Sequence, residues 1–182
     1  MKNFNESLLD ENNELVKLLE GNHPHSQEII SFIKSNAAEG SPIQQRFLGF
    51  IYYYGAGAKQ NYFEALKWYR LAANQGDADS QTQLGWMYQN GEGTAKSNKK
   101  ALNLYQLAAE QGYSKAQVKL GLMHLLGRGT KIDWDKAFEL FRLGALQGDE
   151  HARQLYEQMT QVYEQMTQAE KIFESGFYST LS

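Results

Sequence analysis

The middle of the sequence reads Leu84-Gly85-Trp86-Met87-Tyr88, continues through Gly91-Glu92-Gly93 and Ala101-Leu102-Asn103-Leu104-Tyr105, and reaches Ala108-Ala109-Glu110-Gln111-Gly112. The same residue types recur 36 positions earlier, where Gly49 takes the place of Gly85, and 36 positions later, where Gly121 does. Self-similarity with a period of about 20–50 residues is typical of solenoids and related repeat arrays. The sequence therefore predicts three copies of one repeat, at residues 43–78, 79–114 and 115–150.

Each copy is predicted to hold two antiparallel helices joined by a glycine-containing turn. The second helix of each copy begins at a side chain that accepts hydrogen bonds from first-turn N–H groups, and it ends at a glycine that lets the chain reverse. The first positions are Asn61, Ser97 and Asp133, and the last are Gly76, Gly112 and Gly148. Glu64, three residues after Asn61, supplies the second half of a capping box.

Glycines inside the first helices, at positions 49, 85 and 121, need a separate cause, since glycine in a helix costs about 1 kcal/mol relative to alanine. Repetition at one position suggests close packing of the two helices. We expect Gly85 to lie against the small side chains of Ala101 or Ala108.

The two ends of the chain depart from the repeat. Residues 1–42 are predicted to be a degenerate first copy with helices at 7–20 and 26–36, and residues 151–174 a helix that caps the array, followed by a tail at 175–182. Together they make one α-solenoid domain over residues 1–182 with about four repeats of 36 residues.

The helix at 151–174 also carries a heptad pattern. Tyr-Glu-Gln-Met-Thr-Gln at 156–161 is repeated at 163–168. Apolar residues fall at alternating spacings of four and three, which is the seam of a coiled coil: Leu155, Met159, Val162, Met166, Ala169 and Phe173. The helix is therefore either a terminal cap of a monomer or the interface of a homodimer.

Composition narrows the function classes. The chain has no cysteine, which removes disulfides and thiolate metal sites and suits a reducing compartment. No apolar run approaches the roughly 20 residues of a membrane span, and the amino terminus lacks a signal-peptide core, so we expect a cytoplasmic protein. The net charge is −3, with acidic ends around a mildly basic middle. We expect no nucleic-acid partner, since that needs a concentrated basic stripe.

The pattern Leu-Gly-x-x-Tyr-x-x-Gly-x-Gly followed by Lys-Ala-x-x-x-Tyr-x-x-Ala-Ala-x-Gln-Gly resembles the Sel-one-like repeat (SLR), a tetratricopeptide-like helical pair. The matching residues of the middle copy are Leu84, Gly85, Tyr88, Gly91, Gly93, Lys100, Ala101, Tyr105, Ala108, Ala109, Gln111 and Gly112. The third copy departs from the pattern at His124, Phe141 and Gly144. The resemblance implies an all-α, right-handed α-solenoid that serves as an interaction scaffold, often in bacterial signalling, secretion or toxin-related complexes.

No catalytic constellation is visible. The three Gly-x-Gly segments follow helices and lack the third glycine of a dinucleotide fingerprint, so we interpret them as turns. His23, His25, His124 and His151 lack ligand spacing. We therefore predict no catalytic residue, no metal site and no cofactor.

Positions that the repeat does not require are candidates for binding a partner. In the superhelix implied by the resemblance, the first helices line the concave surface. Trp, Tyr and Arg are the residue types most enriched in interface hot spots. The candidates are Arg46, Phe50, Tyr53, Tyr54, Trp86, Gln89, Asn90, Leu122, Leu125 and Leu126. The alternative is that these side chains pack adjacent first helices together.

The first hypothesis is a non-enzymatic scaffold that binds one protein partner on its concave face, as an immunity or inhibitor protein for a cognate toxin, or as an adaptor in signalling. The second is a ligand-binding or hydrolytic enzyme of the peptidoglycan or β-lactam type found in cysteine-rich relatives, against which the missing cysteines and export signal count. A third, RNA binding, would need basic residues on one face, and Arg46, Thr82 and Val118 do not supply them.

Overall fold

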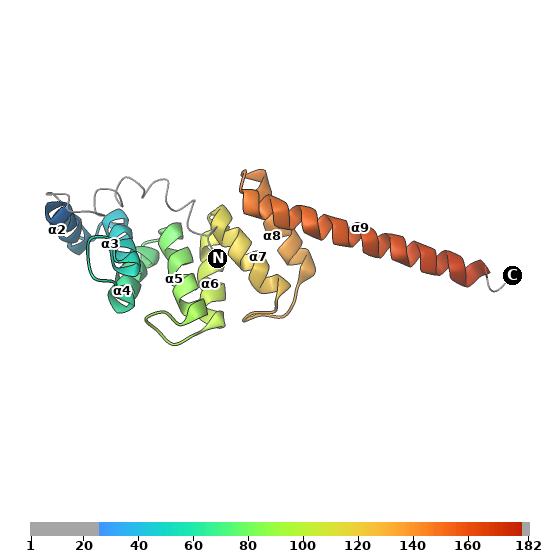
Figure 1. Cartoon of the computed structure of the whole chain (residues 1–182), viewed down its shortest axis with the longest axis horizontal. Coiled ribbons are helices and arrows are strands. Elements are labelled where there is room, and N and C mark those ends of the chain that lie inside the picture. The colour runs from blue at the N-terminus through green and yellow to red at the C-terminus, as the bar shows by residue number, and fades with distance from the viewer. Residues whose placement is uncertain (1–25, 180–182) are drawn as a thin grey trace. The chain divides into compact units, whose positions relative to one another are not determined.

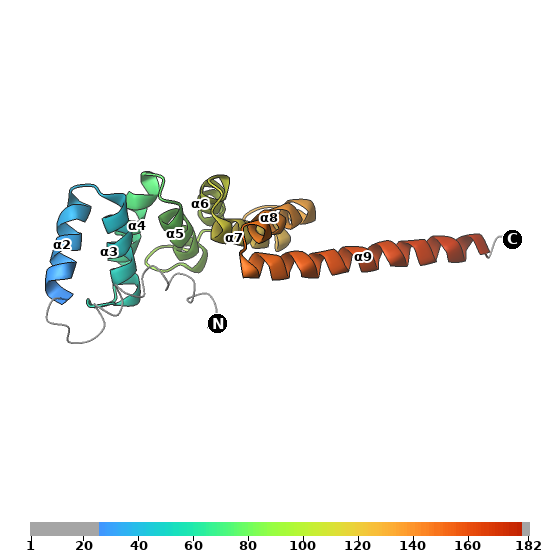
Figure 2. The same cartoon turned by 90° about the horizontal axis from the view of Figure 1, so that it is seen from above.

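The computed structural model describes residues 26–179, and this part of the chain is helical, without strands (Figures 1 and 2). The helices are α2 (Ser26–Ala38), α3 (Pro42–Tyr54), α4 (Tyr62–Asn74), α5 (Ala78–Asn90), α6 (Asn98–Glu110), α7 (Ser114–Leu125), α8 (Trp134–Leu146) and α9 (Glu150–Ser179). The predicted all-α class is confirmed, and the helix expected at 26–36 is α2. The helix expected at 7–20 lies outside the described residues.

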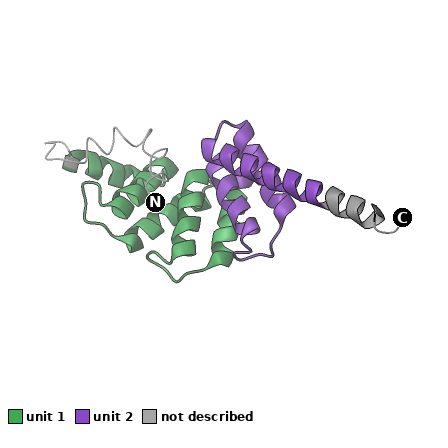
Figure 3. Cartoon of the chain, turned by 45° about the vertical axis from the view of Figure 1, so that its right-hand side comes forward, with its two compact units in different colours: residues 1–108 green, residues 109–182 purple. Residues whose placement is uncertain are grey.

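Two compact units divide the chain, one up to residue 108 and one from residue 109, so that the boundary falls within α6 (Figure 3). In unit 1, α2 packs on α3, α3 on α4 and α4 on α5, and α3 also touches α5. In unit 2, α7 packs on α8, α8 packs on α9, and α7 touches α9. Within each unit, consecutive helices are therefore neighbours, as the repeat predicts.

The predicted starts of the second helices are confirmed. The side chain of Asn61 accepts hydrogen bonds from the backbone N–H groups of Phe63 and Glu64, at 3.1 and 3.2 Å. Asp133 accepts from the N–H of Lys136 at 2.9 Å, and Ser97 accepts from that of Lys100 at 3.3 Å. The backbone N–H of Asn61 donates to the carbonyl of Tyr52 in α3 at 2.8 Å. In a capping box the glutamate would accept from this N–H, so the carbonyl of α3 takes the place of Glu64.

The glycines inside the first helices face aromatic rings. A Cβ on Gly85 would lie 2.7 Å from Tyr105 Cε1, and one on Gly49 would lie 2.6 Å from Tyr69 Cδ1. In unit 2, a Cβ on Gly121 would lie 2.5 Å from Phe141 Cε1. Close packing was the right cause, but the expected neighbours were wrong, because the nearest atoms to Gly85 belong to a buried ring and not to Ala101 or Ala108. The glycine makes room for the largest core side chain of each repeat.

Helices α7, α8 and α9 share the core of unit 2. Ala137, Phe141 and Met159 form a buried cluster, and Leu155 is among the half-buried side chains that pack against it. Gly144, which departs from the family pattern, is explained by this packing, since a Cβ there would lie 2.7 Å from Ala152 Cβ. Replacing the pattern's alanine by glycine lets α9 lie closer to α8.

Helix α9 runs for 30 residues, to Ser179, whereas we expected it to end at 174. Met159 is buried, but Val162 and Met166 on the same row are exposed. The heptad row is therefore divided: its first part packs inside unit 2 and its described remainder faces solvent. No helix in the described part of the chain combines the length and apolar character that crossing a membrane requires.

Candidate functional site

Seven of the ten predicted partner-binding residues lie in unit 1, on α3 and α5. We call this set the α3–α5 surface, and it consists of Arg46, Phe50, Tyr53, Tyr54, Trp86, Gln89 and Asn90. The other three, Leu122, Leu125 and Leu126, lie in unit 2 at the end of α7. Leu122 and Leu125 pack against the Ala137–Phe141–Met159 cluster, whereas Leu126 is exposed.

A chain of hydrogen bonds fixes the aromatic side chains of the α3–α5 surface. Trp86 Nε1 donates to Tyr53 Oη at 3.1 Å, and Tyr53 Oη donates to Glu92 Oε2 at 2.8 Å. Burial of the ring and the bond to Glu92 raise the pKa of Tyr53 far above its usual value, so the hydroxyl stays protonated and remains a donor. Tyr53 and Trp86 are both half-buried. One face of each side chain is therefore held in place, while part of it remains accessible.

Tyr54 lies beside the Trp86–Tyr53–Glu92 hydrogen bonds and is 37% exposed. Its ring centroid lies 4.6 Å from that of Phe50 and 4.8 Å from that of Tyr53, the latter in an edge-on arrangement. Burial raises the pKa of Tyr54 to about 12. Phe50 is 4% exposed, so the ring of Tyr54 packs on a buried ring of the same helix. Tilted and edge-on aromatic pairs stabilise by about 0.5–1.5 kcal/mol beyond the area they bury.

Arg46 connects α3 to the start of α5. Its Nη1 lies 3.1 Å from Asp79 Oδ2, and its Nε lies 3.8 Å from Asp77 Oδ2. Asp77 also caps α5, because its Oδ1 accepts from the N–H of Ser80 at 2.7 Å. The Arg46 guanidinium therefore links α3 to α5, which are the first helices of two consecutive repeats.

Gln89 and Asn90 lie at the end of α5. Gln89 Oε1 accepts a hydrogen bond from the buried Tyr105 hydroxyl at 2.9 Å, so it helps to complete the core. Asn90 is exposed. Of the seven residues, Tyr53, Tyr54 and Trp86 form one continuous group, while Arg46 and Gln89 are engaged with neighbouring side chains.

Glu92 is the important residue that sequence reasoning missed. It stands between Gly91 and Gly93, where the first copy has Ala56 and the third has Arg128. A position that changes character between copies, within a turn whose glycines do not change, is the signal that identifies it. Asp77 and Asp79 were missed for a different reason, because their role depends on Arg46, which is 31 and 33 residues away in the sequence.

The described residues contain no group of three or more His, Asp or Glu side chains placed to hold a metal ion.

Comparison with solved structures finds bacterial proteins of the same architecture among its matches. A Sel1 repeat protein from Oxalobacter formigenes is 36% identical, with a TM-score of 0.65, over 70% of this chain and 96% of that one. The protective antigen c5321 of uropathogenic Escherichia coli, which displays an SLR fold, is 34% identical with a TM-score of 0.67, over 69% of this chain but only 27% of that one.

Cysteine-rich protein B of Helicobacter pylori is 17% identical with a TM-score of 0.58, over 69% of this chain and 93% of that one, and it supports the fold alone. The search of curated proteins found no match. The family model described as Sel1 repeat matches residues 45–77, 78–113 and 114–149, close to the three predicted copies. The chain therefore belongs to the Sel1 repeat family.

Proposed function

We propose that this protein is a non-enzymatic scaffold that binds a protein partner through the α3–α5 surface of unit 1. Sel1 repeat proteins are helical scaffolds for protein interactions. The observation that carries the proposal is the Trp86–Tyr53–Glu92 hydrogen-bonded chain, which fixes two large aromatic side chains that stay partly accessible.

Fixed aromatic side chains suit this role for an energetic reason. Ordering a side chain on binding costs about 0.5–1.5 kcal/mol, and Tyr53 and Trp86 are already ordered in the free protein by their hydrogen bonds. Tyr and Trp also bury a large area per side chain, which makes them frequent hot spots. A partner that covers Tyr54 and the accessible edges of Tyr53 and Trp86 therefore gains apolar burial at low entropic cost.

We further propose that the partner is one cognate protein, either a toxin that this chain inhibits or a signalling protein for which it is an adaptor. A cysteine-free chain suits a reducing compartment, so we propose that the encounter occurs in the cytoplasm. Capture of a toxin from the native lysate would indicate the inhibitor role, and capture of a signalling protein would indicate the adaptor role.

The test is an affinity capture from native lysate, with Tyr54→Ala/Trp86→Ala compared with the wild type. Phe63→Ala is the matched control, since Phe63 is an aromatic side chain of the same unit that is 75% exposed on α4 and belongs to no predicted site. Circular dichroism must first show that all three proteins are folded.

We expect one protein to be retained by the wild type and by Phe63→Ala and lost by the double variant. Retention should persist after nuclease treatment and at high salt, because phosphate contacts weaken steeply with salt. Equal retention by all three proteins would contradict the proposal and leave the aromatic residues as packing between α3 and α5.

A further inference from the structure

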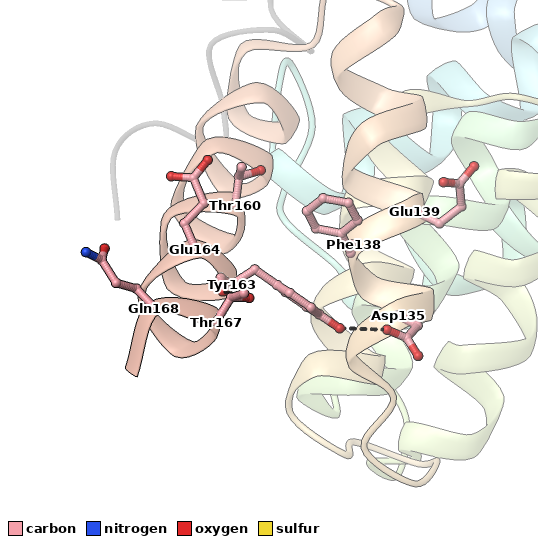
Figure 4. A pocket seen from close by; sticks show the side chains of 8 residues that line it. All are labelled: Asp135, Phe138, Glu139, Thr160, Tyr163, Glu164, Thr167 and Gln168. Carbon is pink, nitrogen blue, oxygen red and sulfur yellow. Dashed lines mark hydrogen bonds between the residues drawn. The ribbon is translucent and has the colours of Figure 1, made fainter. Parts of the chain in front are cut away.

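Unit 2 contains an open cavity of about 770 Å³ between α8 and the middle of α9 (Figure 4). Helix α8 contributes Asp135, Phe138 and Glu139, and α9 contributes Tyr163 and Glu164 among others. We call this cavity the α8–α9 groove. It involves none of the residues of the α3–α5 surface.

The groove exists because a turn is missing. In unit 1, Gly91 is the C-cap of α5, and the turn after it folds back so closely that a Cβ on Gly93 would lie 2.5 Å from the carbonyl oxygen of Tyr62, at the start of α4. The equivalent positions two repeats later are Tyr163 and Gln165, which lie within α9. Among residues 26–179 no such turn covers the start of α8, and Trp134, the equivalent of Tyr62, is 47% exposed.

Aromatic rings form one wall of the groove. The Phe138 ring centroid lies 4.8 Å from that of Tyr156 and 6.1 Å from that of Tyr163. The Tyr163 hydroxyl donates to Asp135 Oδ1 at 3.1 Å, which holds the ring across the groove from α9 to α8 (Figure 4). The negative faces of such rings attract cations within about 6 Å.

Carboxylates surround these rings. Asp135 and Glu139 lie on the α8 side and Glu164 lies on the α9 side, and all three are exposed. Arg142 forms a two-point ion pair with Glu139, with Nη2 to Oε1 at 2.6 Å and Nε to Oε2 at 2.8 Å. Asp135, in contrast, is bonded to a neutral hydroxyl. The described lining of the groove therefore combines negative charge with aromatic surface.

We propose that the α8–α9 groove binds a basic segment of a partner protein, with an Arg or Lys side chain placed over Phe138 and Tyr163 and its charged end between Asp135 and Glu164. Charge complementarity and cation–π attraction both favour this occupant. A second copy of this chain is a poorer fit, because a two-fold interface places the same patch on both sides and would bring carboxylates against carboxylates. The proposal stands independently of the α3–α5 surface.

The test measures fluorescence polarisation of three labelled peptides against the full chain. One has the sequence Gly-Leu-Arg-Ala-Leu-Arg-Gly, and in the other two citrulline or glutamate replaces arginine. Citrulline keeps the planar shape of the arginine side chain and removes its charge. We expect only the arginine peptide to bind, and to bind more weakly at about 0.5 M than at about 0.02 M salt, because salt screens exposed charges.

The tandem duplication supplies a matched control. Glu157 and Glu164 lie in identical six-residue sequences, 156–161 and 163–168, but only Glu164 lines the groove. We expect Asp135→Asn/Glu164→Gln to weaken binding of the arginine peptide about fivefold or more, consistent with the loss of two exposed charge pairs. Glu157→Gln should leave binding unchanged. Tyr163→Leu, which keeps an apolar side chain but removes the ring, should weaken binding as well.

Three outcomes would overturn the proposal. The citrulline peptide could bind as well as the arginine peptide, or Glu157→Gln could weaken binding as much as the double variant does. The chain could also sediment as a dimer that Met166→Glu dissociates, with no binding of the arginine peptide, in which case a second copy is the occupant.

Discussion

Helix α5 ends after 13 residues at Asn90, whereas α9 begins at the equivalent position two repeats later and continues for 30 residues to Ser179. Gly91 ends α5 with φ of 80°, and its N–H donates to the carbonyl of Met87. Tyr163 occupies that position in α9. A side chain disfavours the left-handed conformation by about 1–2 kcal/mol, so the helix continues where the repeat would turn.

The two helices are nevertheless alike on their buried side. Met87 in α5 and Met159 in α9 are equivalent positions, and both are buried. Asp77 and Asp149 both cap their helices, accepting from Ser80 and Ala152 at 2.7 and 2.9 Å. The repeat therefore persists in the first half of α9 and is lost in its second half. Losing one turn is enough to uncover the α8–α9 groove.

The largest effect should come from the glycine that faces a ring. Gly85→Leu places a side chain where Tyr105 already lies 2.7 Å from a Cβ, and both residues are buried. Extra methylenes in a packed core cost about 1–3 kcal/mol, and a whole leucine side chain at a position without room for a Cβ costs more than that, so we expect this variant to exceed the others below. We expect a lowered thermal midpoint or loss of cooperative unfolding by circular dichroism. The equivalent residue of α9 is the exposed Glu157, and Glu157→Leu should change stability by less than about 0.5 kcal/mol. Equal effects would mean that the helix packing differs from that described.

The next largest effect should separate the two halves of the tandem duplication. Met159 is 6% exposed and Met166 is 57% exposed, although both lie in the identical six-residue sequence Tyr-Glu-Gln-Met-Thr-Gln. Met159→Ala should cost about 2–5 kcal/mol, since it leaves a cavity beside Phe141. Met166→Ala should have little effect. Urea unfolding of the two variants measures the difference, and a large loss for Met166→Ala would indicate that its side chain is covered in solution.

A smaller effect should come from exchanging the residues that end α5 and continue α9. Gly91→Ala keeps the required positive φ with a side chain present, at a cost of about 1–2 kcal/mol in urea unfolding. Tyr163→Gly should reduce the helical content of α9, because glycine within a helix costs about 1 kcal/mol. Hydrogen exchange at residues 163–179 measures this change, and unaltered protection would contradict our account of why α9 is long.

The smallest effect should be shared by both helices. Asp77→Ala and Asp149→Ala each remove an N-cap acceptor and should each cost about 1 kcal/mol. Asp77→Asn and Asp149→Asn keep an acceptor oxygen and should recover most of the stability. Asp77 also lies 3.8 Å from Arg46 Nε, so the asparagine variant should recover less at position 77 than at 149. Chemical denaturation of all four variants tests this order.

Sequence patterns predicted the repeat period, the helix pairs and the caps at Asn61, Ser97 and Asp133, because each depends on residues close together in the chain. The Trp86–Tyr53–Glu92 chain could not be predicted in the same way. Its members are separated by 33 and 39 residues, and their hydrogen bonds depend on how α3 and α5 pack. The candidate list therefore contained Tyr53 and Trp86 but lacked Glu92.

The heptad row of α9 likewise separates what the sequence predicts from what tertiary packing decides. Its spacing is a property of the sequence, and it correctly indicated one apolar side of a long helix. Which side chains on that row are covered is decided by the packing of α8, because Met159 lies in the buried cluster with Phe141, whereas Met166, seven residues further on, is exposed. The sequence by itself determined the repeat, its turns and the apolar side of each helix, because these follow from local backbone preference and hydrophobic period. Tertiary packing alone decided which aromatic and acidic side chains stay accessible, because accessibility depends on neighbours that are distant in the chain.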